Sequence, residues 1–178
     1  MTRVSSQDLA TLIKTHIRDI PDYPQPGVVF KDITPLLADA PVFSAVVDGL
    51  GADHGRVDKV AGIEARGFIL AAPVALRLNA GFVPVRKKGK LPAATYSQDY
   101  ELEYGSATLE VHQDAFAAGE RVLIVDDVLA TGGTARATAN LVEMSGATVA
   151  GIAMLIELSF LNGRSKLPGL DVRSLYIV

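Results

Sequence analysis

The apolar positions of this chain follow two spacings, one typical of helices and one typical of strands. Intervals of three and four residues predict four helices. One is capped by Ser5 or Ser6, a second by Asp39, and two more cover Phe68–Leu78 and Thr134–Ser145. The first helix is expected to bury one face, which carries Leu9, Leu12, Ile13, Ile17 and Ile20.

Short apolar runs between these helices predict strands. The run Arg121–Val125 does not alternate with polar residues, so it is expected to be a central parallel strand covered on both faces. Ala107–His112 alternates and is expected to be an edge or half-exposed strand. Residues 86–106 show no apolar period and are expected to form a long loop. The remaining strands are expected at Lys59–Ile63, Phe82–Val85, Val149–Leu158 and Val172–Val178.

Strands separated by helices predict βαβ units, and therefore an α/β fold with a central, mostly parallel, twisted sheet flanked by helices. The length of 178 residues predicts one domain over residues 1–178. Ligands of such sheets bind beyond the carboxyl ends of the strands. Ligand-binding residues are therefore expected in the segments that follow strands, at residues 64–67, 86–106 and 126–134.

Composition narrows the class of protein. No apolar run approaches the ~18 residues of a membrane span, and the first residues lack the apolar segment of a secretory signal. The absence of cysteine excludes disulfides, thiolate nucleophiles and Cys-ligated zinc, and fits a reducing cytoplasm. A net charge of −3 provides no electrostatic attraction for nucleic acid.

The most informative segment is Val122–Ala135, where a buried strand ends in Asp126 and Asp127. A loop of small residues follows and opens a helix. Its glycines allow backbone N–H groups to approach an anion, and the helix N-terminus adds a partial positive charge. No Gly-Lys-Thr/Ser follows, so this is not a Walker loop. This phosphate-binding loop, here called the phosphate cradle, consists of Ala130, Thr131, Gly132, Gly133 and Thr134.

The two carboxylates indicate what lies beside that phosphate. Two acids would repel a polyphosphate, whereas the vicinal hydroxyls of a ribose are donors that carboxylates accept. A ribose 5-phosphate therefore suits Asp126, Asp127 and the cradle together. We expect Gly132 and Gly133 to lie against the 5′-phosphate, where a side chain would collide with it. The alternative is a tight turn, capped by a threonine, beside a solvated acid pair.

This segment resembles the phosphoribosyl-diphosphate-binding motif of type I phosphoribosyltransferases. Further matches narrow the resemblance to the members that act on adenine, and it extends over about residues 8–165. It implies transfer of the 5-phosphoribosyl group from phosphoribosyl diphosphate to adenine, which yields AMP and pyrophosphate in purine salvage. It also implies a small N-terminal hood (about residues 1–35), a flexible lid (about residues 91–106) and a homodimer. The further matching motifs are Pro26–Ile33, Gly62–Phe68, Arg86–Pro92 and Leu102–Gly105.

A basic run, made of Arg86, Lys87, Lys88 and Lys90, follows the strand that ends near Val85. Cations there would balance the charge that grows on a pyrophosphate leaving group; the alternative is a solvated basic loop. The resemblance assigns Arg66, Arg86 and Lys90 to the pyrophosphate, with Arg66 and Arg86 also counted as catalytic. It also implies a non-proline cis peptide between Ala65 and Arg66. We include Lys87 among the diphosphate-binding residues.

Two other segments are expected to serve the base and the reaction. Phe30 is expected to stack on the purine, while backbone groups near Val29 and Lys31 donate to a ring nitrogen and accept from the exocyclic amine; the alternative is a short core strand. Glu103 and Tyr104 lie in the lid, which would exclude water from an oxocarbenium-like state. Glu103 is expected to manage a proton at the five-membered ring of the purine, unless it is an ordinary exposed carboxylate.

Magnesium is expected to arrive with the substrate, because its diphosphate offers hard oxygen ligands. No dedicated metal site is expected, although Asp126 or Asp127 could contact the ion through water. Two rivals to adenine transfer stay open at this point. One is the same reaction on hypoxanthine, xanthine or orotate. The other is a non-catalytic regulator that binds phosphoribosyl diphosphate.

Overall fold

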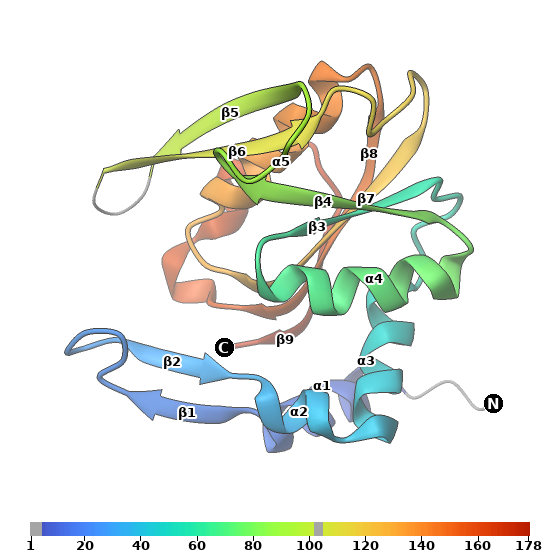
Figure 1. Cartoon of the computed structure of the whole chain (residues 1–178). Coiled ribbons are helices and arrows are strands. Elements are labelled where there is room, and N and C mark those ends of the chain that lie inside the picture. Colours follow the sequence, from blue (N-terminus) through green and yellow to red (C-terminus); the bar gives the residue numbers. More distant parts are fainter. Residues whose placement is uncertain (1–4, 102–104) are drawn as a thin grey trace.

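A seven-stranded sheet forms the body of the protein, and a separate two-stranded sheet lies beside it (Figure 1). The computed structural model describes residues 5–101 and 105–178. The strand order of the large sheet is β5-β6-β4-β3-β7-β8-β9. Strands β4, β3, β7, β8 and β9 are parallel, whereas β6 and β5 are antiparallel additions at one edge. The strands are β3 (Lys59–Ile63), β4 (Gly81–Lys87), β5 (Thr95–Glu101), β6 (Ser106–His112), β7 (Arg121–Leu129), β8 (Thr148–Glu157) and β9 (Val172–Ile177).

Helices cover both faces of this sheet, so its central strands are buried on two sides (Figure 1). The predicted α/β fold with a mostly parallel, helix-flanked sheet is therefore confirmed. Helix α5 packs on one face, and α1, α3 and α4 pack on the other. The helical segments are α1 (Ser6–His16), α2 (Thr34–Ala38), α3 (Ala40–Gly51), α4 (Arg66–Leu78), α5 (Gly133–Met144) and the 3-10 turns η1 (Ser159–Leu161) and η2 (Gly163–Lys166).

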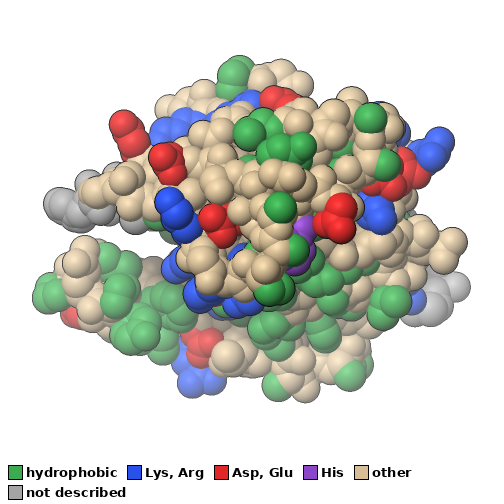
Figure 2. Space-filling view, turned by 45° about the horizontal axis from the view of Figure 1, so that its top comes forward, with side chains coloured by type: hydrophobic (Ala, Val, Ile, Leu, Met, Phe, Trp, Pro, Cys, Tyr) green, Lys and Arg blue, Asp and Glu red, His purple; other side chains and the backbone are tan. Residues whose placement is uncertain are grey.

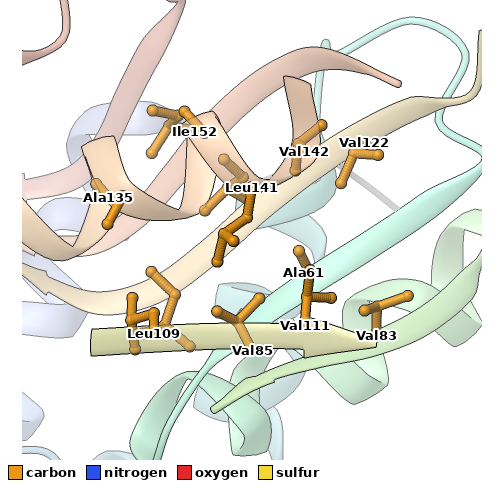
Figure 3. Packing of buried hydrophobic residues seen from close by; sticks show 14 of the residues in the cluster. Ala61, Val83, Val85, Leu109, Val111, Val122, Ala135, Leu141, Val142 and Ile152 are labelled. Atoms are coloured by element: carbon orange, nitrogen blue, oxygen red, sulfur yellow. The ribbon is translucent and has the colours of Figure 1, made fainter. Parts of the chain in front are cut away.

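Two apolar layers result from this arrangement, one on each side of β7. On the α5 side, Leu141 and Val142 pack toward Val85 and Leu109 (Figure 3). Residues from β7 alternate between the layers, with Ile124 in this layer and its neighbours in the other. Burying one such aliphatic side chain is worth about 1.5–3 kcal/mol. The two layers hold β7 rigidly in place, and with it the acid pair at its end.

Both helix caps expected from the sequence are present. The Ser5 hydroxyl accepts a hydrogen bond from the Asp8 N–H (3.2 Å), and the Asp39 carboxylate accepts from the Val42 N–H (3.1 Å). Helix α1 nevertheless ends at His16, so placing Ile17 and Ile20 on it was wrong. The chain from Arg18 onward instead becomes β1 (Arg18–Pro21), which pairs antiparallel with β2 (Val29–Asp32).

The expected long loop over residues 86–106 was also wrong, because it contains β5. Strand β5 pairs antiparallel with β6 along its whole length. Its alternate residues Tyr96 and Tyr100 pack against the core, while polar residues between them obscure the apolar period. Strand β6 therefore lies between β4 and β5, not at the edge. Among the described residues, no helix is both long and apolar enough to cross a membrane.

Candidate active site

The carboxyl ends of β3, β4 and β7 meet the N-terminus of α5 at one end of the sheet. On the same side, a notch separates the β1–β2 sheet from the β5–β6 hairpin, and Lys and Arg side chains gather toward its inner end (Figure 2). Because ligands of parallel α/β sheets bind beyond the carboxyl ends of the strands, this is the candidate site. Residues from the motifs around Phe30, Arg66, Arg86 and Asp127 contact one another in this region.

The acid pair lies within β7 and is almost completely buried. Asp126 and Asp127 are 8% and 6% exposed, and the Asp127 N–H donates to the Asp126 carboxylate (2.9 Å). Gly67, at the start of α4, permits close packing here, because a Cβ at that position would lie 2.7 Å from Asp126 Oδ1. Burial, reinforced by the charge of Asp127, raises the pKa of Asp126 well above its usual range. A solvated acid pair, the alternative considered from the sequence, is therefore wrong.

Arg66 connects this acid pair to the two-stranded sheet. Its Nη2 lies 2.7 Å from Asp127 Oδ2 in an ion pair that lacks hydrogen-bond alignment. Its Nη1 donates to the carbonyl of Lys31 (3.3 Å), and its guanidinium lies over the Phe30 ring, 4.7 Å from the centroid. One side chain thus touches two segments that the sequence analysis assigned to different parts of the ligand.

The expected non-proline cis peptide is present, but it lies one residue earlier in the chain than predicted. The non-proline cis peptide joins Glu64 to Ala65, not Ala65 to Arg66.

The phosphate cradle lies between the end of β7 and the start of α5. Thr131 is exposed, whereas Gly132 and Gly133 are buried, and Gly132 has a φ of +81°. A Cβ at Gly132 would overlap the carbonyl oxygen of Gly163, and one at Gly133 would lie 3.2 Å from the carbonyl oxygen of Glu101. A side chain at Gly132 would therefore meet the protein's own backbone, and the contact of both glycines with the 5′-phosphate stays a prediction.

The carboxylate of Glu64 binds three residues of the basic run. Glu64, at the end of β3, accepts a hydrogen bond from the Lys87 N–H (3.0 Å) and a longer one from Arg86 Nε (3.4 Å), and it pairs with Lys90 Nζ. Burial alone would raise the pKa of Glu64, but the hydrogen bonds from Lys90 and the Lys87 N–H, together with the two positive charges, lower it. Glu64 is thus ionised and holds Arg86 and Lys90 at the strand end, which contradicts a freely solvated basic loop.

Glu64 belongs to the motif Gly62–Phe68, which by itself indicates no role for this residue. The signal that was available is its position, because it is an acid that directly follows a buried strand, ahead of a helix.

The segment assigned to the base lies on the two-stranded sheet. Val29 is 49% exposed and Phe30 packs edge-on against Tyr23, with ring centroids 5.2 Å apart. The Lys31 ammonium pairs with Asp19 (2.8 Å). The backbone carbonyl of Lys31 separately accepts the hydrogen bond from Arg66. The alternative of a short core strand is wrong, since β2 belongs to neither apolar layer.

Glu103 and Tyr104 lie outside the described residues. Within the described part of the chain, no group of three or more His, Asp or Glu side chains is arranged to hold a metal ion.

Comparison with known proteins identifies the class first. Residues 38–168 match the model of the phosphoribosyl transferase domain. A crystal structure of adenine phosphoribosyltransferase from Thermoanaerobacter pseudethanolicus superposes with a TM-score of 0.92 at 55% identity, covering 95% of this chain and 99% of the other. The fold and site thus define a phosphoribosyltransferase.

Curated relatives narrow the class further. The adenine phosphoribosyltransferase of Acidothermus cellulolyticus is 65% identical over 94% of this chain and 96% of its own. The Saccharomyces cerevisiae adenine phosphoribosyltransferase, solved with an imino-altritol bisphosphate and adenine, has a TM-score of 0.88 at 37% identity, with 95% and 99% coverage. This chain belongs to the adenine phosphoribosyltransferase family, and its reaction is the salvage of adenine to AMP. Neither transfer to another base nor a regulatory role is favoured.

Proposed function

We propose that adenine and phosphoribosyl diphosphate react between the two-stranded sheet and the carboxyl ends of β3, β4 and β7, giving AMP and pyrophosphate. The observation that carries this proposal is the position of Arg66. It contacts Asp127 on the sheet and both Phe30 and the Lys31 carbonyl on β2. A base held by β2 and a sugar held by Asp127 would therefore be neighbours, as bond formation between them requires.

The charges of the site match the parts of phosphoribosyl diphosphate. The 5′-phosphate would bind the phosphate cradle, where backbone N–H groups and the N-terminus of α5 favour an anion. The ribose hydroxyls would donate to Asp126 and Asp127. The diphosphate would bind the cations that Glu64 gathers, namely Arg86 and Lys90, together with Lys87 and Arg66. The acidic residues would thus face the sugar, and the basic residues would face the diphosphate of the same substrate.

Adenine would be recognised at β2. Phe30 would stack on the purine, and the backbone near Val29 and Lys31 would offer one donor and one acceptor to its edge. The Lys31 carbonyl at present accepts a 3.3 Å hydrogen bond from Arg66, so it faces the site. The relatives from S. cerevisiae and Giardia lamblia were solved with adenine and with 9-deazaadenine, respectively, which supports adenine as the base.

The reaction exchanges one bond at C1′ for another. Purine N9 forms a bond to C1′ as the bond from C1′ to the pyrophosphate oxygen breaks, and the leaving pyrophosphate keeps the bonding electrons. Arg66 and Arg86 would stabilise its growing negative charge. Adenine would react as the tautomer protonated at N7, and Glu103 would accept that proton as N9 bonds to C1′. Tyr104 would belong to the lid that keeps water out.

Magnesium enters this proposal as part of the substrate. The ion would arrive bound to the diphosphate oxygens, which suit its preference for hard oxygen ligands. Asp127 Oδ2 is buried and lies 2.7 Å from Arg66 Nη2, so a water molecule on that ion would reach it only if Arg66 moves toward the diphosphate. The diphosphate complex would therefore dock on the basic run while a bridging water contacts Asp126 or Asp127.

We further propose that the enzyme is a cytoplasmic homodimer. Leu76 is 83% exposed and Ile69 is 45% exposed on α4. Leu76 borders a shallow, mostly apolar groove of about 450 Å³ between α3 and α4, which also includes Phe43 and Val47. A second subunit covering α4 would bury Leu76 and Ile69. The absence of cysteine fits a reducing compartment.

The test is a comparison of bases. Each of adenine, hypoxanthine and guanine is incubated with phosphoribosyl diphosphate and magnesium, and pyrophosphate release is followed. Adenine is expected to exceed the others by several orders of magnitude in kcat/KM, because a site built around hydrogen bonds rejects a mismatched analogue strongly. Comparable turnover of hypoxanthine would overturn the proposed recognition at Val29 and Lys31.

A further inference from the structure

The loop after β8 lies directly behind the phosphate cradle. A Cβ at Gly132 would overlap the carbonyl oxygen of Gly163, and a Cβ at Gly163 would overlap the carbonyl oxygen of Ala130. The two backbones therefore touch without side chains between them. Gly163 is buried although its neighbours on both sides are exposed. The position of the cradle thus depends on what holds Gly163 in place.

An ion pair between an exposed arginine and a buried glutamate provides that hold. Arg164, the residue after Gly163, donates from Nε and Nη2 to the two carboxylate oxygens of Glu157, each at 2.7 Å. Its Nη1 donates to the carbonyl of Val172 (2.7 Å). Ser174 adds a hydrogen bond to Glu157 (2.6 Å). One guanidinium therefore ties the loop to the end of β8 and the start of β9.

The register of the sheet connects this pair to the cradle. Glu157 is the last residue of β8 and lies opposite Leu129, the last residue of β7 before the cradle begins at Ala130. Its side chain is 8% exposed. The hydrogen bonds from Arg164 and Ser174, with the Arg164 charge, outweigh burial and lower the pKa of Glu157. The pair is thus a charged, bidentate contact anchored to the strand next to the one that carries the cradle.

We propose that Glu157 and Arg164 are positioning residues for the transfer reaction. They press Gly163 against Ala130 and Gly132, and so keep the backbone N–H groups of the cradle oriented toward the 5′-phosphate. Their role is indirect, and it rests on the proposed assignment of the cradle to that phosphate. An arginine suits this role, because its planar fork bonds both carboxylate oxygens while a third donor reaches the Val172 carbonyl.

The test separates binding of the phosphorylated substrate from binding of adenine. Arg164→Ala is expected to raise the KM for phosphoribosyl diphosphate by about tenfold, since small misplacements of binding groups cost this much or more. The KM for adenine should change less than twofold. Arg164→Lys keeps the charge but not the fork, so its increase should be smaller. Arg56→Ala removes an exposed arginine that pairs with Asp58 (2.8 Å) at the opposite end of the sheet, and it should match the unaltered enzyme.

Calorimetry provides a second readout. AMP, which carries the 5′-phosphate, should bind Arg164→Ala about tenfold more weakly, whereas magnesium pyrophosphate should bind it unchanged. An equal loss of affinity for both ligands, or an unchanged KM for phosphoribosyl diphosphate, would overturn the proposal. Should Arg164→Ala not fold, Ser174→Ala provides the same comparison with a smaller effect, because it removes one hydrogen bond from Glu157.

A crystal soaked with AMP distinguishes this proposal from the one on which it rests. If the phosphate of AMP lies away from residues 130–134, the cradle does not bind it and both proposals fail. If the phosphate lies in the cradle but the Arg164 variants bind AMP normally, only the positioning role of Glu157 and Arg164 is wrong.

Discussion

The guanidinium of Arg66 faces the carboxylate of Asp127 across 2.7 Å, although the two residues are 61 positions apart in the chain. Parallel pairing of β3 and β7 brings them together, because Arg66 follows the end of one strand and Asp127 lies near the end of the other. Arg66 is thereby held between the acid pair and the Phe30 ring. A change in either partner alters both the proposed sugar site and the proposed base site.

Asp127→Asn should weaken the binding of phosphoribosyl diphosphate and AMP. The substitution removes an anionic acceptor for the ribose hydroxyls, and a hydrogen bond to a charged group is worth about 1.5–3 kcal/mol. The dissociation constant, measured by calorimetry, should rise about tenfold to a hundredfold. Asp48→Asn, in an exposed pair with Arg77, is the matched control. Undiminished binding by both Asp126→Asn and Asp127→Asn would contradict the ribose assignment.

Gly132→Ala should damage both stability and substrate binding. Gly132 and Gly119 have the same φ of +81°, but only Gly132 has protein atoms where a Cβ would lie. Gly119→Ala should therefore cost only the strain of that backbone conformation, about 1–2 kcal/mol. Gly132→Ala adds the clash with Gly163, so it should lower the melting temperature further and raise the KM for phosphoribosyl diphosphate. Identical behaviour of the two variants in thermal unfolding would contradict the packing described here.

Glu103→Gln should lower kcat far more than it weakens the binding of phosphoribosyl diphosphate. The proposed role of Glu103 is proton transfer at purine N7, and removing such a group typically costs about 10²–10⁴ in rate. Steady-state kinetics across pH should also show the loss of any acidic limb that reports this carboxylate. Glu143→Gln, on the exposed surface of α5, is the control. A near-normal kcat would favour the alternative, in which Glu103 is an ordinary exposed carboxylate without a role in proton transfer.

His54 should make the protein less stable at mildly acidic pH. It is 6% exposed and packs against Gly151, with Arg173, Asp171 and Asp53 as its charged neighbours. Burial, followed by the charge of Arg173, lowers the pKa of His54 below the usual histidine value of about 6.5. The unfolded chain therefore takes up the proton first. The contribution of neutral His54 is complete above about pH 6.5 and declines as the pH falls through the lowered pKa.

The measurement for His54 is urea unfolding of the protein and of His54→Asn between pH 8 and pH 5. Packing changes caused by the substitution are already present at pH 8, where the histidine is neutral in both states. The difference in unfolding free energy between the two proteins should shrink as the pH falls. A constant difference over this range would show that burial of His54 is not linked to protonation.

Elements with a strong local signal were predictable from the sequence. The unbroken apolar run before Asp126 indicated a central strand, and β7 lies in the middle of the sheet between two parallel neighbours. Ser5 and Asp39 were recognisable as caps because capping involves residues only two or three positions away. The small-residue turn from strand to helix at residues 130–134 was recognisable for the same reason. In each case the residues that interact are also close in the chain.

Tertiary structure decided the features that depend on residues far apart in sequence. Strand β5 forms because β6 offers it a partner and the core accepts Tyr96 and Tyr100, which its polar sequence does not reveal. Gly132 is constrained by Gly163, and Glu64 binds the basic run, only because the strand order places these segments side by side. Local propensity and periodicity act over a few residues, whereas such contacts arise when the whole sheet assembles. The sequence by itself therefore determined the motif and the elements with a strong local signal, whereas the assembled sheet decided the remaining strands and which side chains act together.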